Sequence, residues 1–512
     1  MKILYLFLLV WFPVFCISCY EDKGNYGYRE LNQAEVSGIE TTYRRDLLSQ
    51  LTITPVVSSK DKNRTYDYMW MYYRERTKGL DTLSYEKDLN WNLALEPAVY
   101  QLIFAYRDRQ TDVTKQVYAE LTVESKYSRG WYVMKQKGQN TDLDFFSPEF
   151  ENSDLMLKTR GNALAGKPQC LGFVADYAYI DEEKGELVKN NMSLVAIAEN
   201  ELQMVRISDM QLVGDFNTLF YEEQSRQIPQ KWFGGSDESG LINDGQVYTI
   251  DVHGSPLGSA KFAYAKGGDY HVANLFTKNG TMCPLLFDTK SSRFCTVNRG
   301  NPNLIYLASD DQSKFPAAYP DMEPVYAGFL DEGMWAGGKG YVVMQKKDGD
   351  KPRSVLHFDL KCLVNYDAAA FKNRIMAIDE IPAVSAMAGA ECFGMSRTFQ
   401  MLYFSKGDKL YYFDLQNKQE HEVKSVSGQT AVPAGERIVL IKHIIFDNSY
   451  SAPDEYTNKL VVATGNGNHY KLYLFETTAD KVKDGPIVYQ GEGVPSEVMY
   501  MSSKMGNGYL CY

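Results

Sequence analysis

The sequence predicts an all-β protein in which a small immunoglobulin-like sandwich precedes a β-propeller of seven blades, with six or eight as the alternatives. Runs of alternating apolar and polar residues separated by turn residues indicate strands, and one strand-turn-strand unit recurs along the chain. The 37 Tyr, 25 Phe and 39 Gly suit many short strands joined by tight turns. A chain of 512 residues is also too long for one ordinary core.

Residues 1–18 have the features of a cleaved signal. Lys2 supplies a positive start, residues 3–17 are almost wholly apolar, and Ser18 directly precedes Cys19. The apolar stretch is shorter than the roughly 20 residues that a membrane-spanning helix needs. A signal that ends at a Cys resembles that of bacterial lipoproteins, which implies acylation of Cys19. An ordinary secretory signal with an incidental Cys19 is the alternative.

Residues 19–35 are predicted to form a polar tether, because charged residues and Gly follow one another there without apolar periodicity. The run CYEDKGNYGY that starts at Cys19 resembles the opening of the PKD-like lipoproteins of Bacteroidetes, which are encoded beside outer-membrane importers of the SusC/SusD type. The acidic pair Glu21-Asp22 is similar to the signal that exports such lipoproteins to the outer face. The resemblance implies a lipid anchor in the outer membrane and a position outside the cell.

Residues 36–125 are predicted to form the sandwich. Alternating runs at residues 51–57, 66–72, 100–106 and 117–123 are separated by turns rich in Asp, Lys and Asn. Trp70 lies in a central run, so we expect it to fill the core, and we prefer core packing to ligand stacking for Trp91 as well. The Tyr-x-x-Trp run, with Pro97 leading into Tyr100, resembles the PKD fold.

Residues 130–512 are predicted to form the propeller. The clearest unit is residues 401–415, where the turn Lys406-Gly407-Asp408 separates two aromatic strands. The same plan recurs at intervals of 44 to 64 residues, a period typical of propeller blades. The second strand of each unit carries one marker residue: Phe145, Val205, Ile250, Phe294, Phe358, Phe413 and Phe475.

Three further features concern the blades. Residues 215–221 and 367–378 have helical spacing after an Asp, so both are predicted to be helices between blades. Residues 497–501 and 509–512 are predicted to pair with the first blade and close the ring. An acidic residue follows several second strands, where we expect it to close a turn rather than bind a ligand: Asp251, Asp359, Asp414 and Glu476.

The residues that carry chemistry do not form a catalytic or metal-binding pattern, so no catalytic residue, metal or cofactor is predicted. The six His have no HxH or HxxxH spacing, and the six Cys that follow Cys19 form no CxxC. Cys283 and Cys295 could bridge a hairpin, but buried free thiols are the preferred interpretation. A net charge of −11 without a basic run argues against a nucleic-acid partner.

Two loops are the better candidates for ligand recognition. Trp232 and Phe233 lie in a segment rich in Gly, Ser and acidic residues, and Trp335 lies between Gly residues. Tyr270 and His271 form a weaker third site. Aromatic rings exposed beside hydrogen-bonding groups suit sugar rings or peptide side chains. Packing inside the blades is the equally weighted alternative for each Trp.

The expected function follows from the resemblance together with these loops. The protein is expected to be a non-catalytic lipoprotein of the cell surface that binds a glycan or a peptide beside a SusC/SusD-type importer. One alternative is a propeller-based hydrolase or lyase, which needs carboxylates or a Tyr/His pair converging at the central funnel. The other alternative is an accessory subunit that contacts only the importer.

Overall fold

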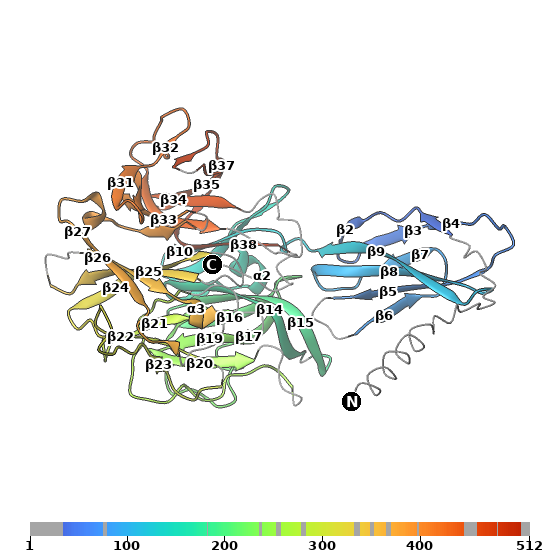
Figure 1. Ribbon diagram of the computed structural model, residues 1–512, viewed down its shortest axis with the longest axis horizontal. Coiled ribbons are helices and arrows are strands. Elements are labelled where there is room, and N and C mark those ends of the chain that lie inside the picture. The colour runs from blue at the N-terminus through green and yellow to red at the C-terminus, as the bar shows by residue number, and fades with distance from the viewer. Residues whose placement is uncertain are drawn as a thin grey trace, which may run out of the picture.

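The computed structural model describes residues 34–502 except for short gaps at 75–78, 182, 235–237, 252–257, 278–282, 299, 332–337, 349–352, 365–369, 397–398, 445–457 and 479. The described chain forms two β units, a sandwich and a propeller, which lie side by side in Figure 1. The predicted fold class is therefore confirmed.

The sandwich contains nine strands in three sheets. A five-stranded sheet has the order β2-β9-β8-β5-β6, in which β2 runs parallel to β9, and the pairs β3-β7 and β1-β4 form two small sheets. The strands are β1 (Glu35–Ser37), β2 (Thr42–Asp46), β3 (Gln50–Ile53), β4 (Val56–Ser58), β5 (Tyr66–Tyr73), β6 (Asp81–Ser84), β7 (Leu89–Asn92), β8 (Ala98–Asp108) and β9 (Val113–Glu124).

Trp70 occupies the centre of the sandwich core, as predicted. Its side chain is fully buried, its ring lies 4.8 Å from that of Phe104 on β8, and its indole N–H donates to the carbonyl of Lys87 at 3.0 Å. Trp91 is partly buried and packs 5.4 Å from Tyr72. Both Trp residues therefore serve the packing of the sandwich, because alternation along β5, β7 and β8 directs one side of each strand inward.

The propeller has seven blade sheets of three to five strands among the described residues, besides the two-stranded sheet β32-β36, and this confirms the favoured number of blades. Successive strands pair antiparallel within each blade. Blades 1 to 3 contain β10 (Gly130–Lys137), β11 (Asn140–Phe146), β12 (Glu151–Asn152) and β13 (Leu164–Ala165); β14 (Pro168–Asp181), β15 (Glu186–Ala198), β16 (Glu201–Arg206) and β17 (Leu212–Asp215); and β18 (Pro229–Phe233), β19 (Glu238–Asn243) and β20 (Gln246–Asp251).

Blades 4 to 7 continue the ring, and each again starts with its innermost strand or segment. Their strands are β21 (Leu285–Asp288), β22 (Arg293–Thr296) and β23 (Ile305–Tyr306); β24 (Met322–Asp331), β25 (Gly338–Lys346), β26 (Arg353–Asp359) and β27 (Ile375–Ile381); β28 (Phe393–Met395), β29 (Met401–Lys406), β30 (Lys409–Asp414) and β31 (Gln419–Glu422); and β33 (Arg437–Ile444), β34 (Lys459–Asn466), β35 (His469–Phe475) and β37 (Ile487–Glu492). The short strands β32 (Lys424–Ser425) and β36 (Lys481–Val482) pair with each other.

The seven marker residues lie at equivalent places in the ring. They fall on β11, β16, β20, β22, β26, β30 and β35, each of which is the third strand of its blade once the segment at Thr277, which bridges to Leu285, is counted as the first strand of blade 4. Asp414 closes its turn as expected, because its Oδ1 accepts the backbone N–H groups of Gln416 and Asn417. The recurring sequence unit is thus the pair of central strands of a blade.

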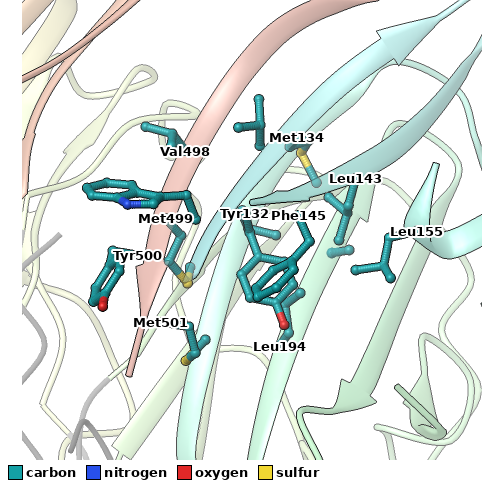
Figure 2. Close-up of a cluster of buried hydrophobic side chains, with 14 of the residues drawn as sticks. Tyr132, Met134, Leu143, Phe145, Leu155, Leu194, Val498, Met499, Tyr500 and Met501 are labelled. Atoms are coloured by element: carbon teal, nitrogen blue, oxygen red, sulfur yellow. The ribbon is translucent and has the colours of Figure 1, made fainter. Parts of the chain in front are cut away.

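The last described strand, β38 (Val494–Met501), closes the ring. It pairs antiparallel with β10 and so completes blade 1 from the opposite end of the chain. Figure 2 shows Val498 to Met501 beside Tyr132 and Phe145 in the buried cluster of this blade. Residues 497–501 therefore pair as predicted, whereas residues 509–512 lie outside the described part of the chain.

Both helices predicted between blades are wrong. The Asp215 carboxylate accepts the backbone N–H of Thr218 and so closes a single turn. Phe220 then pairs with Phe262 in an isolated β-bridge, so the turn does not continue as a helix. Ile375–Ile381 is strand β27, because the edge of β26 supplies a full ladder of hydrogen bonds; residues 367–369 lie outside the described part. Among the described residues the helices are α2 (Leu155–Arg160), α3 (Lys361–Val364) and the 3₁₀ turn η2 (Ala386–Gly389).

The sandwich and the propeller meet at the long β14–β15 hairpin of blade 2 (Figure 1). The Arg74 guanidinium, just after β5, lies 2.9 Å from the carboxylate of Asp176 on β14, and both side chains are buried. The Ser125 hydroxyl donates to the carbonyl of Ile207 at 3.2 Å. In the described chain Cys170, Cys295 and Cys392 are free thiols, so Cys283 and Cys295 do not form a disulfide with each other.

Candidate binding site in the propeller channel

The innermost strands of the seven blades surround a central channel. β14 contacts β18, β24 contacts β28, β28 contacts β33, and β33 contacts β38, so these strands stand around one axis. Between them lies a cavity of about 320 Å³, whose walls come from β14, β18, β24, β28, β33 and β38 and from residues 275–277 of blade 4. This volume is at the lower end of the range for small-molecule sites.

Glycines on the inner strands allow neighbouring blades to approach closely at the channel wall. A Cβ at Gly172 of β14 would stand 2.8 Å from the Trp232 ring, and one at Gly328 of β24 would stand 2.7 Å from Met395 Cβ. A Cβ at Gly394 of β28 would stand 2.6 Å from the Ile441 side chain. The close approach of neighbouring blades at the axis therefore requires residues without a side chain at these places.

One arc of the wall, formed by blades 7, 1, 2 and 3, is charged. Lys442 on β33 donates from Nζ to Glu497 Oε1 on β38 at 2.6 Å and to the carbonyl of Val498 at 3.2 Å. Lys231 on β18 donates from Nζ to the carbonyl of Gln169 on β14 at 2.9 Å. Two ammonium groups and one carboxylate thus line this arc, in a chain whose net charge is −11.

The three charged groups of this arc influence one another. Burial by itself would raise the pKa of Glu497, but the positive charges of Lys442 and Lys231 and the hydrogen bonds that the carboxylate accepts outweigh burial and lower its pKa. The Cys170 thiol on β14 lies in the same arc, and burial raises its pKa. At neutral pH the arc therefore presents an ionised Glu497 carboxylate and a neutral Cys170 thiol.

The opposite arc, formed by blades 4, 5 and 6, is apolar and aromatic. Phe276, Tyr326 and Phe393 line it and are each partly exposed. The Tyr326 and Phe393 rings lie 5.8 Å apart, and the Tyr326 hydroxyl accepts the backbone N–H of Met395 at 2.6 Å. The channel is therefore two-sided, with charge on one wall and ring faces on the other.

The sequence-predicted aromatic residues of blade 3 are buried rather than exposed. Trp232 and Phe233 are each 2% exposed, because β18 is the innermost strand of its blade and its alternate side chains pack against the neighbouring blades. The expectation of an exposed aromatic loop is wrong for this pair. Trp232 nevertheless borders the channel, and among the described residues its indole N–H has no hydrogen-bond partner.

Tyr270 and His271 lie away from the described wall of the channel. Tyr270 is buried, its hydroxyl donates to the carbonyl of Lys266 at 2.9 Å, and burial raises its pKa to about 12. The expected exposure of Tyr270 is thus also wrong. His271 is partly exposed, and its backbone N–H donates to Asp288. Trp335 and Cys19 lie outside the described part of the chain, so the predictions for them stay predictions.

Sequence reasoning missed the charged residues of the wall. Lys231, Lys442 and Glu497 come from three blades and share no motif. A signal for the inner strands does exist, since Gly172-Phe173, Gly328-Phe329 and Gly394-Met395 each place a large apolar residue after a Gly near the start of a blade. The pair is not specific to inner strands, because Gly240-Leu241 and Gly340-Tyr341 lie on the second strands β19 and β25.

Two further properties of the described chain concern metal binding and membrane spanning. Within the described ranges, no group of three or more His, Cys, Asp or Glu side chains is arranged to hold a metal ion. No helix in this part of the chain has the length and apolar character to cross a membrane.

One family model matches the N-terminal part of the chain. The model of the PKD-like family matches residues 19–168, which include the sandwich and strands β10 to β13 of blade 1. The N-terminal region is similar to the PKD-like family. A search of curated proteins gives no match.

Solved structures of other proteins are similar at low identity. A quinonprotein alcohol dehydrogenase-like protein from Bacteroides thetaiotaomicron is 12% identical, with 93% of this chain and 100% of that chain covered and a TM-score of 0.36. YCF48 from Cyanidioschyzon merolae is 10% identical, with 69% of this chain and 97% of that chain covered and a TM-score of 0.34. A DUF4784 family protein from Bacteroides caccae is 8% identical, with 76% of this chain and 95% of that chain covered and a TM-score of 0.31.

Proposed function

We propose that the protein is a lipoprotein of the outer cell surface that captures a glycan or peptide fragment in its propeller channel and acts beside a SusC/SusD-type importer. The observation that carries the capture role is the two-sided cavity of about 320 Å³ at the propeller axis. Partly exposed rings opposite hydrogen-bonding groups are the usual composition of a site for small polar ligands. The lipid anchor at Cys19 and the importer are inferred from the N-terminal sequence.

A binding role accounts better for the wall than a hydrolytic role does. Glycoside hydrolysis by the usual mechanism uses two carboxyl groups, one of them kept protonated to act as the acid. Glu497 is held ionised by its pairing with Lys442, and it is the single carboxylate among the described residues that line the cavity. An ionised, paired carboxylate is poorly suited to donate a proton.

The capture role is tested by blocking the channel. Ser496 on β38 lines the cavity and is exposed, so Ser496→Trp places a ring in the channel without disturbing the core. We expect the wild-type protein to be retained by a subset of an array of glycans and peptides, and Ser496→Trp to lose at least tenfold of that retention. The matched control is Ser58→Trp on β4, an exposed position in the sandwich, which should bind as wild type does.

Three outcomes would overturn the proposed function. Equal retention of wild type and Ser496→Trp would remove the channel as the site, and no retention at all would remove the capture role. Turnover of an array ligand would show an enzyme instead. The location is tested separately in a Bacteroidetes host, where Cys19→Ala should abolish incorporation of labelled palmitate and the cleavage of the protein by protease added to intact cells.

A further inference from the structure

The charged arc of the channel contains one cation that is not neutralised by a direct ion pair. Lys442 is paired with Glu497 at 2.6 Å. Lys231, by contrast, has a neutral carbonyl oxygen as its hydrogen-bond acceptor, and among the described residues no carboxylate oxygen lies within the 4.0 Å of an ion pair. An ammonium group has three N–H donors, so Lys231 retains donors and a positive charge for a ligand.

Trp232, which follows Lys231 on β18, does not offer a donor to the cavity. Its side chain is 2% exposed, and its indole N–H, which has no hydrogen-bond partner in the described structure, is buried. Its ring packs against Phe262 in the cluster between blades 2 and 3. An acceptor group that enters the channel at this part of β18 therefore meets the Lys231 ammonium.

The aromatic arc limits what can accompany that acceptor group. Phe276, Tyr326 and Phe393 present ring faces and edges on the other side of the same cavity. Ring faces contact flat apolar surfaces well, including the C–H face of a sugar ring or an apolar peptide side chain. The ligand therefore needs an anionic acceptor on one side and a flat apolar face on the other.

We infer that the channel selects ligands that carry a carboxylate, which binds at Lys231 while the apolar face of the ligand packs on Phe276, Tyr326 and Phe393. This inference rests on the proposed capture role and adds the chemical class of the ligand. A carboxylate accepts several hydrogen bonds at once and forms charge-assisted bonds to ammonium groups. Two sources supply such a group, a uronic acid in an acidic glycan and the free C-terminus of a peptide.

The test uses matched pairs of probes that are alike except that the carboxyl groups of one member are charged and those of the other are masked. Trigalacturonate is compared with its methyl ester, and an apolar tripeptide with a free C-terminus is compared with its C-terminal amide, by titration calorimetry with the full-length protein. We expect one acidic probe to bind at least tenfold more tightly than its neutral partner. The pair of probes that shows this difference identifies the source of the carboxylate, which is either an acidic glycan or the C-terminus of a peptide.

Variants assign the effect to Lys231. Lys231→Gln should reduce the affinity for the acidic probe at least tenfold and leave the affinity for the neutral partner unchanged, whereas Lys231→Arg should retain the preference because the positive charge is kept. The control is Lys290→Gln, which removes an exposed lysine paired with Asp269 on the surface of blade 4. Thermal unfolding of each variant establishes that it folds.

The outcomes separate this inference from the proposed function. Equal binding of acidic and neutral probes that Ser496→Trp abolishes would overturn the carboxylate preference and leave the capture role intact. A preference that persists in Lys231→Gln would also overturn the inference, because the charge would be recognised elsewhere. Binding of neither member of either pair, with retention of other ligands on the array, would overturn the assigned class as well.

Discussion

At the scale of single residues, the seam between the first and last blades contains a buried charge network. Lys135 on β10 is fully buried and lies 2.6 Å from the carboxylate of Asp144 on β11 and 2.9 Å from that of Asp154. Tyr470 on β35 donates its hydroxyl to Asp144 at 2.6 Å. The network therefore joins blade 7 to blade 1. Because Lys135, Asp144 and Tyr470 are buried, loss of the Lys135 ammonium would leave the Asp144 carboxylate as an uncompensated buried charge.

Replacing Lys135 should be costly for this reason. Lys135→Met keeps the apolar volume but leaves Asp144 without its ammonium partner, and we expect a loss of about 3–5 kcal/mol in the free energy of unfolding. Lys137→Met is the matched control, because Lys137 also contacts Asp154 but is 41% exposed, and such pairs contribute about 1 kcal/mol or less. Urea denaturation of both variants measures the difference. Equal losses would contradict a special role for the buried pair.

At the scale of elements, large side chains on the inner strands pack at the channel and between blades, and glycines between them let the next blade approach closely. β28 illustrates this arrangement. Phe393 lies at the channel, Met395 packs in the cluster between blades, and Gly394 between them faces β33. The position of each inner strand is thus fixed by a residue that has no side chain, since a larger residue would push the neighbouring blade outward.

Gly394→Ala tests this dependence on close approach. The added Cβ would stand 2.6 Å from Ile441 Cγ2 and 2.8 Å from the Ile441 carbonyl oxygen, and backbone cannot move aside cheaply. We expect a loss of about 1–3 kcal/mol, the usual cost of overpacking. In Gly389→Ala, the control, the nearest atom would be Lys406 Cε at 3.6 Å, so stability should change little. Thermal unfolding of the two variants compares them, and a neutral Gly394→Ala would refute the packing argument.

At the scale of the whole molecule, the sandwich is attached to the propeller by more than the connecting segment. The Arg74–Asp176 ion pair lies in the joint between β5 and the long hairpin of blade 2, with side chains 2% and 0% exposed. The Ser125 hydroxyl adds a hydrogen bond to Ile207. A buried ion pair is weak evidence for stability, but it fixes geometry because both groups need their partners. We therefore expect the two domains to hold a defined orientation.

Removing the ion pair should loosen this joint. In Arg74→Ala, Asp176 keeps a buried charge without its guanidinium, and the free energy of docking should fall by about 3–5 kcal/mol. Limited proteolysis should then cleave the segment between residues 125 and 130 faster than in the wild type, while cleavage at other sites keeps its wild-type rate. Arg109→Ala, which removes an exposed pair with Asp67 in the same sandwich, is the control and should leave the proteolysis rate unchanged. An unaltered rate in Arg74→Ala would contradict a docked joint.

Much of the fold could be predicted because its signals are local. Strand-turn-strand units such as residues 401–415 depend on alternation and on turn residues such as Gly407, which adopts φ 65°. The marker residues and the core position of Trp70 follow from the same alternation. The two helices were predicted wrongly because residues 215–221 and 375–378 bond to strands far away in the sequence, and helical spacing in a short segment does not outweigh such partners.

The sequence by itself determined the all-β class and the repeating unit, and it favoured seven blades over six or eight, since each depends on contacts between near neighbours in the chain. Only the tertiary structure decided the candidate site. Lys231, Lys442 and Glu497 meet because β38 pairs with β10 across the whole length of the propeller and brings blades 7, 1, 2 and 3 together around one axis. The same closure buries Trp232 against β14. Which residues face a channel is a property of the closed ring, and alternation along one strand carries no information about it.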